Sequence, residues 1–203
     1  MDSIKITFSI LVLLTLACCT EIHNIQVLDN NNFSQYIERF NLEDEELYIQ
    51  YVSNDSALAF LSENIPLIDV PDKDIEETYY FRWWTYRKHL KETEDGFVVT
   101  EFLPPVPWAK KHNTINCPAG HHIYEGRWLR NPEYVQDYIN FWLNRSDDGI
   151  RQYSFWIADA LLSFQNVHPN DSILSNHLEK LTNNYNEWAK NYCCIKKKTY
   201  LIY

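Results

Sequence analysis

Apolar residues return at helical spacing along most of the chain. Between residues 72 and 91 the positions Ile75, Tyr79, Trp83, Tyr86 and Leu90 follow one helix face and predict a long helix over Asp72–Lys91. Aromatic side chains also occupy other positions of this segment. A helix that is aromatic nearly all round is typical of one that packs on more than one side or lines a cavity.

Further helices follow from the same periodicity and from capping signals. A proline suits the first position of a helix, and Asn before proline is a strong start signal. Regular structure is expected to begin between Phe33 and Leu42. The further predicted helices span Asp55–Asn64, Pro118–Leu129, Asn131–Trp142, Ser154–Val167 and a final segment that begins at Asn170-Asp171 and carries Leu178, Leu181, Tyr185 and Trp188.

One short segment has the alternation and composition of a strand. Gly96–Phe102 is rich in β-branched and aromatic residues and is closed by the proline-rich stretch Pro104–Pro107. The chain therefore reads as helix pairs joined by turns, with one β-hairpin inserted. Consecutive helical hairpins indicate an α-solenoid or a closed α/α toroid, and the low identity between the hairpins disfavours a regular repeat array.

Composition and charge narrow the function. The 203 residues suffice for one domain of ordinary size, and four glycines disfavour glycine-rich phosphate loops and turn-rich all-β folds. The net charge of −10 repels a phosphate backbone, and no basic patch stands out before Lys196–Lys198 at the end. We therefore predict no nucleic-acid partner.

The N-terminus resembles an export signal. Lys5 precedes the apolar run Ile6–Ala17, which is too short to span a bilayer comfortably. The run ends in Leu16-Ala17-Cys18-Cys19, so a lipoprotein-type signal over residues 1–18 with lipidation at Cys18 is predicted. The expected location is the periplasm or cell envelope, with membrane contact only through that anchor. A plain secretory signal stays open as an alternative. The five cysteines offer no disulfide framework.

Groups suited to sugar are concentrated between Tyr79 and Trp156. Sugars present apolar faces and a rim of hydroxyls, so their sites combine flat aromatic rings with carboxylates and arginines. The predicted substrate-binding residues are Arg82, Trp83, Trp84, Arg87, Trp108, His121, His122, Glu125, Arg127, Tyr153 and Trp156. Structural roles compete with this interpretation: the tryptophans could be core, the arginines could pair with Glu76 or Glu77, and the histidines could bond to backbone.

A metal site is a second alternative for the same segment. His112, Cys117, His121, His122 and Glu125 are ligand types crowded into a short stretch. The order His-x-x-Glu-Gly lacks the second histidine of helical zinc motifs, and Cys117 has no CxxC partner. No metal and no cofactor are therefore predicted.

Several longer runs resemble a known family. Pro71-Asp72-Lys73, Glu76–Trp84, Thr100–Pro104, Asn113–Cys117, Ala119–His122 and Glu125–Leu129 are similar to bacterial six-hairpin glycosidases of the mannosylglycerate-hydrolase-like group, relatives of trehalases. The resemblance covers about Asp55 to Trp188 and implies an all-α fold: helical hairpins of an incomplete (α/α)6 toroid with a short β-hairpin insertion. The implied domains are a signal peptide (1–18), a tether (19–40), the N-terminal part of the glycosidase domain (41–190) and an aberrant tail (191–203).

The resemblance implies hydrolysis of an α-linked glycoside by a carboxylic acid and a carboxylate base, with carbohydrate as the partner. In relatives of this type these two groups come from later hairpins, whereas the tail after residue 190 departs from the family pattern. The catalytic pair is thus unknown here, with Glu125 and Asp159 as fallback candidates. A truncated, inactive hydrolase fragment is expected; the alternative is a non-catalytic envelope glycan-binding or adaptor protein of helical hairpins.

Overall fold

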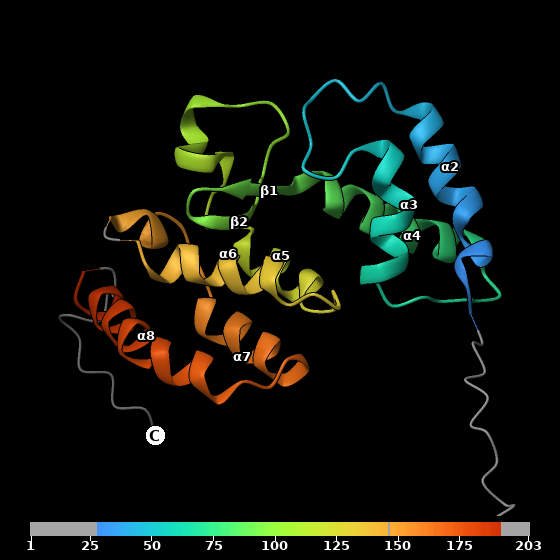
Figure 1. Ribbon diagram of the computed structural model, residues 1–203. Coiled ribbons are helices and arrows are strands. Elements are labelled where there is room, and N and C mark those ends of the chain that lie inside the picture. Colours follow the sequence, from blue (N-terminus) through green and yellow to red (C-terminus); the bar gives the residue numbers. More distant parts are fainter. Residues whose placement is uncertain (1–27, 146, 192–203) are drawn as a thin grey trace, which may run out of the picture.

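The computed structural model describes residues 28–145 and 147–191. The expected signal peptide with Cys18, most of the expected tether and nearly all of the expected tail lie outside these residues. Within the described chain the fold is all-α with one small β-hairpin, which confirms the predicted fold class (Figure 1).

The helices and strands follow the predicted order closely. Short 3-10 helices lie at Asn30–Asn32, Pro107–Ala109, Lys111–Asn113 and Asp148–Arg151. The main elements are α2 (Ser34–Glu43), α3 (Asn54–Asn64), α4 (Lys73–His89), β1 (Leu90–Thr93), β2 (Gly96–Val99), α5 (Ala119–Gly126), α6 (Glu133–Leu143), α7 (Ile157–Val167) and α8 (Asp171–Asn191).

Helix α4 begins and ends for identifiable reasons. The Asp72 carboxylate caps its start, accepting from the backbone N–H groups of Asp74 at 3.1 Å and Ile75 at 3.2 Å. The helix ends at His89 rather than at the predicted Lys91, because Leu90 turns into β1 and pairs with Val99 of β2. The prediction missed β1 since its apolar residue also fits the helical spacing.

The elements form two groups joined by the hairpin. Helix α2 packs on α3 and α4, whereas α5 packs on α6 and α7, and α8 packs on α6 and α7 (Figure 1). Strand β2 packs on α6, where the Phe97 and Tyr134 rings meet edge to face with their centroids 4.8 Å apart. The hairpin therefore connects the α2–α4 group to the α5–α8 group.

The folded part starts earlier than the expected boundary at residue 41. Phe33 is fully buried and stacks on Tyr80, with ring centroids 4.8 Å apart, and Ile37 and Phe40 of α2 are also buried. The predicted tether to residue 40 is therefore too long, because residues 33–40 supply apolar side chains to the core.

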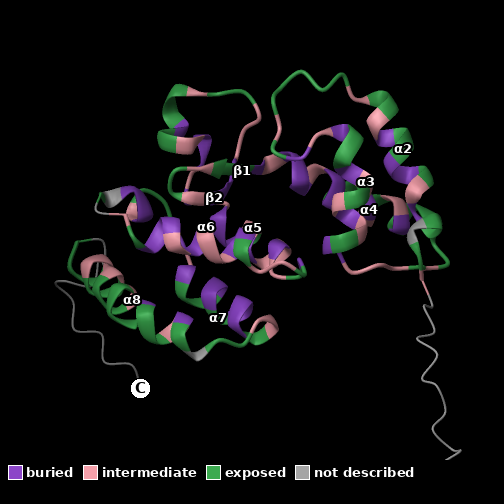
Figure 2. Ribbon diagram, in the orientation of Figure 1, coloured by how far each residue is buried: buried purple, intermediate pink, exposed green. Residues whose placement is uncertain are grey.

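Burial is uneven across the helices. Figure 2 shows buried residues along α4, α6 and α7 and a largely exposed outer face on α8. Leu178 and Tyr185 of α8 are 65% and 71% exposed. Among the residues that the structure describes, no helix combines the length and hydropathy needed to cross a bilayer.

Candidate active-site surface

Helix α5 packs on α7 and receives side chains from α4, and two of its positions have no side chain. A Cβ atom at Gly120 would come within 2.6 Å of the Trp156 ring next to α7. A Cβ atom at Gly126 would come within 2.0 Å of the Tyr86 hydroxyl of α4. The two glycines thus leave room against α5 for the aromatic side chains of Trp156 and Tyr86.

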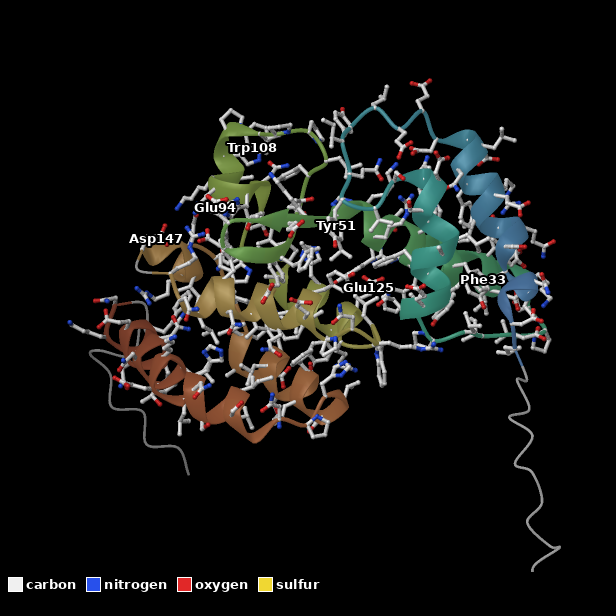
Figure 3. All side chains as sticks on the ribbon, in the orientation of Figure 1. Phe33, Tyr51, Glu94, Trp108, Glu125 and Asp147 are labelled. Atoms are coloured by element: carbon white, nitrogen blue, oxygen red, sulfur yellow. The ribbon has the colours of Figure 1, made fainter. Side chains whose placement is uncertain are left out.

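A cleft of about 290 Å³ opens between α4, the end of β2 and α5. Its lining includes Arg82, His89, Glu101, His122 and Glu125. Arg82 donates from Nη2 to Oε2 of Glu125 at 2.6 Å, which ties α4 to α5 across the cleft. Figure 3 places Glu125 near the centre of the molecule, between the two groups of helices. Three of the predicted substrate-binding residues, Arg82, His122 and Glu125, therefore line the same cleft.

His122 and Glu101 face each other inside this cleft. His122 Nε2 lies 3.6 Å from Glu101 Oε2, and the two side chains are 18% and 30% exposed. Burial, reinforced by the nearby His89, His121 and Arg82, lowers the pKa of His122 to about 3. Burial also raises the pKa of the Glu101 carboxyl above its ordinary value. The pair thus favours neutral forms of both groups.

A second set of groups lies where α5 meets α7. The Tyr124 hydroxyl donates to Asp159 Oδ2 at 2.5 Å, and this bond raises the pKa of Tyr124. The Trp156 ring lies 5.0 Å from the rings of both His121 and Tyr124. The fallback carboxylate Asp159 is exposed, so this corner combines an aromatic face with a carboxylate at the surface.

Three predicted sugar-binding residues have structural roles instead. Trp83 and Trp84 are 4% and 5% exposed, and Trp84 donates from Nε1 to Asn41 Oδ1 at 2.8 Å. Arg87 is fully buried and donates to the Val52 carbonyl at 2.6 Å. None of the three lines the cleft. Their side chains are buried, which agrees with the structural alternative for the two tryptophans, whereas Arg87 bonds a backbone carbonyl rather than Glu76 or Glu77.

The remaining predicted residues lie at the margins. Trp108 is 65% exposed on the loop after the hairpin and contacts Phe102, away from Glu125 (Figure 3). Tyr153 is 49% exposed in the loop before α7. The Arg127 guanidinium lies 4.4 Å from the centroid of the Tyr124 ring and so borders the α5–α7 corner.

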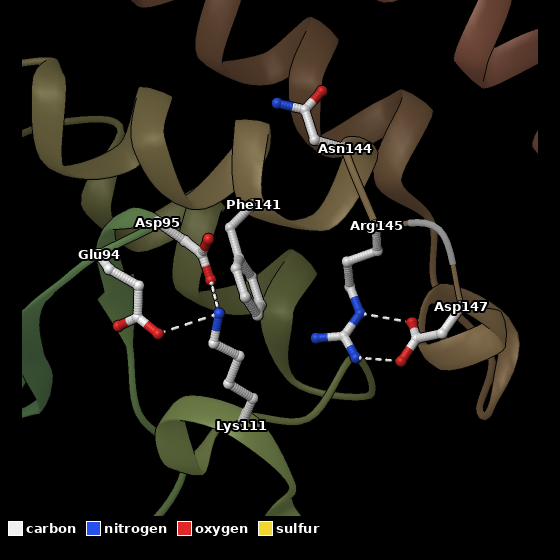
Figure 4. A pocket seen from close by; sticks show the side chains of 7 residues that line it. All are labelled: Glu94, Asp95, Lys111, Phe141, Asn144, Arg145 and Asp147. Carbon is white, nitrogen blue, oxygen red and sulfur yellow. Dashed lines mark hydrogen bonds and ion pairs between the residues drawn. The ribbon is translucent and has the colours of Figure 1, made fainter.

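The five residues of the metal alternative do not converge. Within the described residues, the group of three possible ligand atoms that all lie within 4.8 Å of one another belongs to Glu94, Asp95 and His112. Lys111 already bonds both carboxylates of this group, at 3.1 Å and 2.5 Å (Figure 4). The single positive charge of Lys111 therefore offsets part of the negative charge of this acidic pair.

A separate pocket of about 560 Å³ adjoins this group. Its charged groups pair with one another. The Arg145 guanidinium donates two hydrogen bonds to the Asp147 carboxylate, at 2.8 Å and 2.6 Å (Figure 4). Phe141 forms one wall between the two ion-paired sets. Since its charged groups already bond one another, this pocket offers few free polar groups to a ligand.

Sequence reasoning missed Glu101, His89 and Tyr124. Glu101 directly follows a buried strand end and lies within the Thr100–Pro104 run that carries the family resemblance, which was the available signal. His89 and Tyr124 gave no such signal. Each becomes part of the surface only because α4 and α7 pack on α5, which the sequence alone does not specify.

Comparisons with known proteins give the family that part of the chain resembles. The family model of the mannosylglycerate hydrolase MGH1-like glycoside hydrolase domain matches residues 111–197, which hold α5, α6, α7 and α8. The predicted resemblance is confirmed over this segment, which is similar to that glycoside hydrolase domain.

A solved structure described as a sialidase is similar over most of the chain. It is 39% identical with a TM-score of 0.75, and the match covers 81% of this chain and 16% of that chain. The chain thus spans about a sixth of the length of that relative. The similarity reaches beyond residues 111–197 and includes helices of the α2–α4 group.

Proposed function

We propose that the chain recognises the sugar of an α-linked glycoside on the surface formed by α4, α5 and α7. The observation that carries the proposal is the convergence of Arg82, His122 and Glu125 in one cleft, while the Trp156 ring contacts His121 on the α7 side of α5. An ion pair with unused donor positions can bind vicinal hydroxyls, and an aromatic ring can cover an apolar sugar face. The glycoside-hydrolase family match gives the ligand class.

We infer that this chain binds a glycoside without hydrolysing it. Hydrolysis uses two carboxyl groups on opposite sides of the scissile bond. The two carboxyl groups that line the cleft belong to Glu101 and Glu125, and Glu125 is engaged by Arg82 at 2.6 Å. The fallback Asp159 lies outside the cleft and accepts from Tyr124 at 2.5 Å. The cleft thus offers one unengaged carboxyl group, Glu101, where hydrolysis requires two. A non-catalytic glycan-binding protein is therefore the favoured form of the proposal.

Calorimetric titration with methyl α-D-mannopyranoside and with mannosylglycerate tests this function, and release of free mannose is followed in parallel. Wild-type protein is expected to bind at least one probe and to release no sugar. Arg82→Ala should weaken binding about tenfold, because a charge-assisted contact is lost. Arg130→Ala, an exposed arginine outside the cleft, serves as the matched control. Absence of binding would refute the proposal, and sugar release would refute its non-catalytic form.

We also propose that the chain is exported and lipid-anchored, which rests on the apolar run Ile6–Ala17 followed by Cys18. Metabolic labelling with palmitate in a bacterial host is the test. The natural chain should incorporate label and Cys18→Ser should not. Equal labelling of Cys19→Ser and the natural chain would identify Cys18 as the modified residue, whereas an unlabelled natural chain would support the plain secretory alternative.

A further inference from the structure

Glu101 is held rigidly at the mouth of the cleft. Its backbone N–H donates to the Asn113 carbonyl at 3.0 Å, and the preceding Thr100 N–H donates to the His89 carbonyl at 2.8 Å. The Asn113 amide in turn donates to the carbonyls of Phe102 and Pro104. These bonds anchor the backbone of the loop that follows β2, and with it the position from which the Glu101 side chain extends.

A chain of hydrogen bonds assigns the proton on His122. Thr114 donates from Oγ1 to the Val99 carbonyl at 2.8 Å, so the Tyr138 hydroxyl, 2.8 Å from the same Oγ1, must be the donor between them. The Tyr138 oxygen is then an acceptor, and it lies 3.4 Å from His122 Nδ1. His122 therefore carries its proton on Nδ1 and turns an unprotonated Nε2 toward Glu101.

The Glu101 carboxyl keeps unused bonding capacity. Among the residues that the structure describes, no side chain or backbone group donates a hydrogen bond to it. An unprotonated Nε2 facing a carboxylate at 3.6 Å would set two lone pairs against each other, whereas a proton on Glu101 can point at Nε2. The second carboxyl oxygen remains free to accept from a group that enters the cleft.

We propose that Glu101 is a further ligand-binding residue of the cleft and that His122 is its positioning residue. The Glu101 carboxyl accepts a hydrogen bond from a hydroxyl of the bound sugar. The inference rests on the proposed function and adds a residue outside the 111–197 segment that matches the family model. The ligand class is a neutral, hydroxyl-rich ring, because the pair is itself uncharged when it shares one proton.

The charged and titratable neighbours come from every element around the pair. Arg82, Tyr86 and His89 face it from α4, His121 and Glu125 from α5, and Tyr138 from α6. Arg82 is engaged by Glu125, so Glu101 has no close cationic partner. When the pH rises and Glu101 loses its proton, an ionised carboxylate should therefore face Nε2 of His122, and the ligand affinity should change. Burial raises the pKa of the Glu101 carboxyl, which agrees with this expectation.

The test is a two-dimensional NMR titration of the full chain with methyl α-D-mannopyranoside. Glu101→Ala should weaken binding about tenfold or more, and Glu101→Gln, which keeps an acceptor oxygen, should weaken it by a smaller factor and remove its pH dependence. Glu63→Gln, an exposed glutamate on α3, should bind like wild type. Spectral dispersion of each variant shows whether it is folded.

A second variant isolates the positioning role of His122. Tyr138→Phe removes the acceptor at Nδ1, so the ring proton can move to Nε2 and donate to Glu101, and the carboxyl should then titrate at lower pH in ¹³C spectra. Unchanged titration in a folded Tyr138→Phe would overturn that role. Wild-type binding that Glu101→Ala leaves intact would overturn the inference alone, whereas a wild type that does not bind refutes the proposed function and the ligand role of Glu101 with it.

Discussion

At the scale of single residues, Gly126 leaves room on α5 for the Tyr86 hydroxyl of α4. An added Cβ would lie 2.0 Å from the Tyr86 hydroxyl and 2.7 Å from Val135 Cγ2. Distances under 3 Å force a neighbour or the helix to move. We expect Gly126→Ala to lower the free energy of unfolding by about 2 kcal/mol, in the range typical of overpacked cores, as measured by urea denaturation.

A double-mutant cycle identifies the contact responsible. Tyr86→Phe removes the hydroxyl and its 3.0 Å bond to the His122 carbonyl, which should cost about 1 kcal/mol by itself. Combined with Gly126→Ala it should cost less than the sum of the two single changes, because the clash is partly relieved. Strict additivity would show that the hydroxyl is not the obstacle.

His122 makes stability depend on pH. Its pKa is lowered from 6.5 to about 3 by burial, so the folded state binds fewer protons than the unfolded chain between these values. The stability that follows from this shift is present above 6.5 and is lost as the pH falls toward 3. His122→Gln should therefore show a shallower loss of unfolding free energy between about pH 7 and about pH 4.

The exposed His121 provides the comparison for this experiment. His121→Gln should keep a pH slope close to that of wild type, because it leaves the buried His122 imidazole in place. A slope for His122→Gln equal to that of wild type would mean that the buried imidazole does not govern the acid response.

Residue roles were harder to predict than residue neighbourhoods. The pattern around Tyr79–Trp128 indicated a dense polar and aromatic site, and Arg82, His122 and Glu125 do meet there. Trp84 and Arg87 looked equally suitable, yet both are buried on the α2–α3 side of the same helix. Which face of an all-aromatic helix turns to the cleft depends on tertiary packing, and spacing cannot specify it.

At the scale of elements, α4 is the support of the cleft, and its start depends on one side chain. Asp72→Ala removes the acceptor for the N–H groups of Asp74 and Ile75 and should lower the free energy of unfolding by about 1 kcal/mol. Asp74→Ala leaves this cap in place and should cost clearly less. Equal losses in urea denaturation would contradict a specific role of the cap.

Most helices were predictable because local signals mark their ends. Asn131 and Asn170 accept backbone N–H groups at the starts of α6 and α8, at 3.0 Å and 3.1 Å, as their positions in the sequence indicated. Strand β1 was not predicted as a separate element. Its four residues continue the helical spacing of α4, and only pairing with β2 makes them a strand.

At the scale of the whole molecule, the packing of α5 against both α4 and α7 turns separate motifs into one surface. The sequence indicated helical hairpins and a sugar-binding composition, but the cleft also needs Glu101 from the end of the β-hairpin. This juxtaposition arises because β2 packs on α6 while α6 packs on α5. Contacts of this kind are long-range, and periodicity carries no information about them.

Glycoside recognition at the α4–α5–α7 surface is tested most directly by a residue-resolved NMR titration with mannosylglycerate. We predict saturable shift changes that cluster on Arg82, His122, Glu125 and the Trp156 indole, while the exposed face of α8 stays unchanged. Trp156→Ala should weaken glycoside binding about tenfold, since a stacking ring contributes on the order of 1 kcal/mol or more to the binding free energy. Shift changes confined to another face, or none at saturating glycoside, would contradict the account.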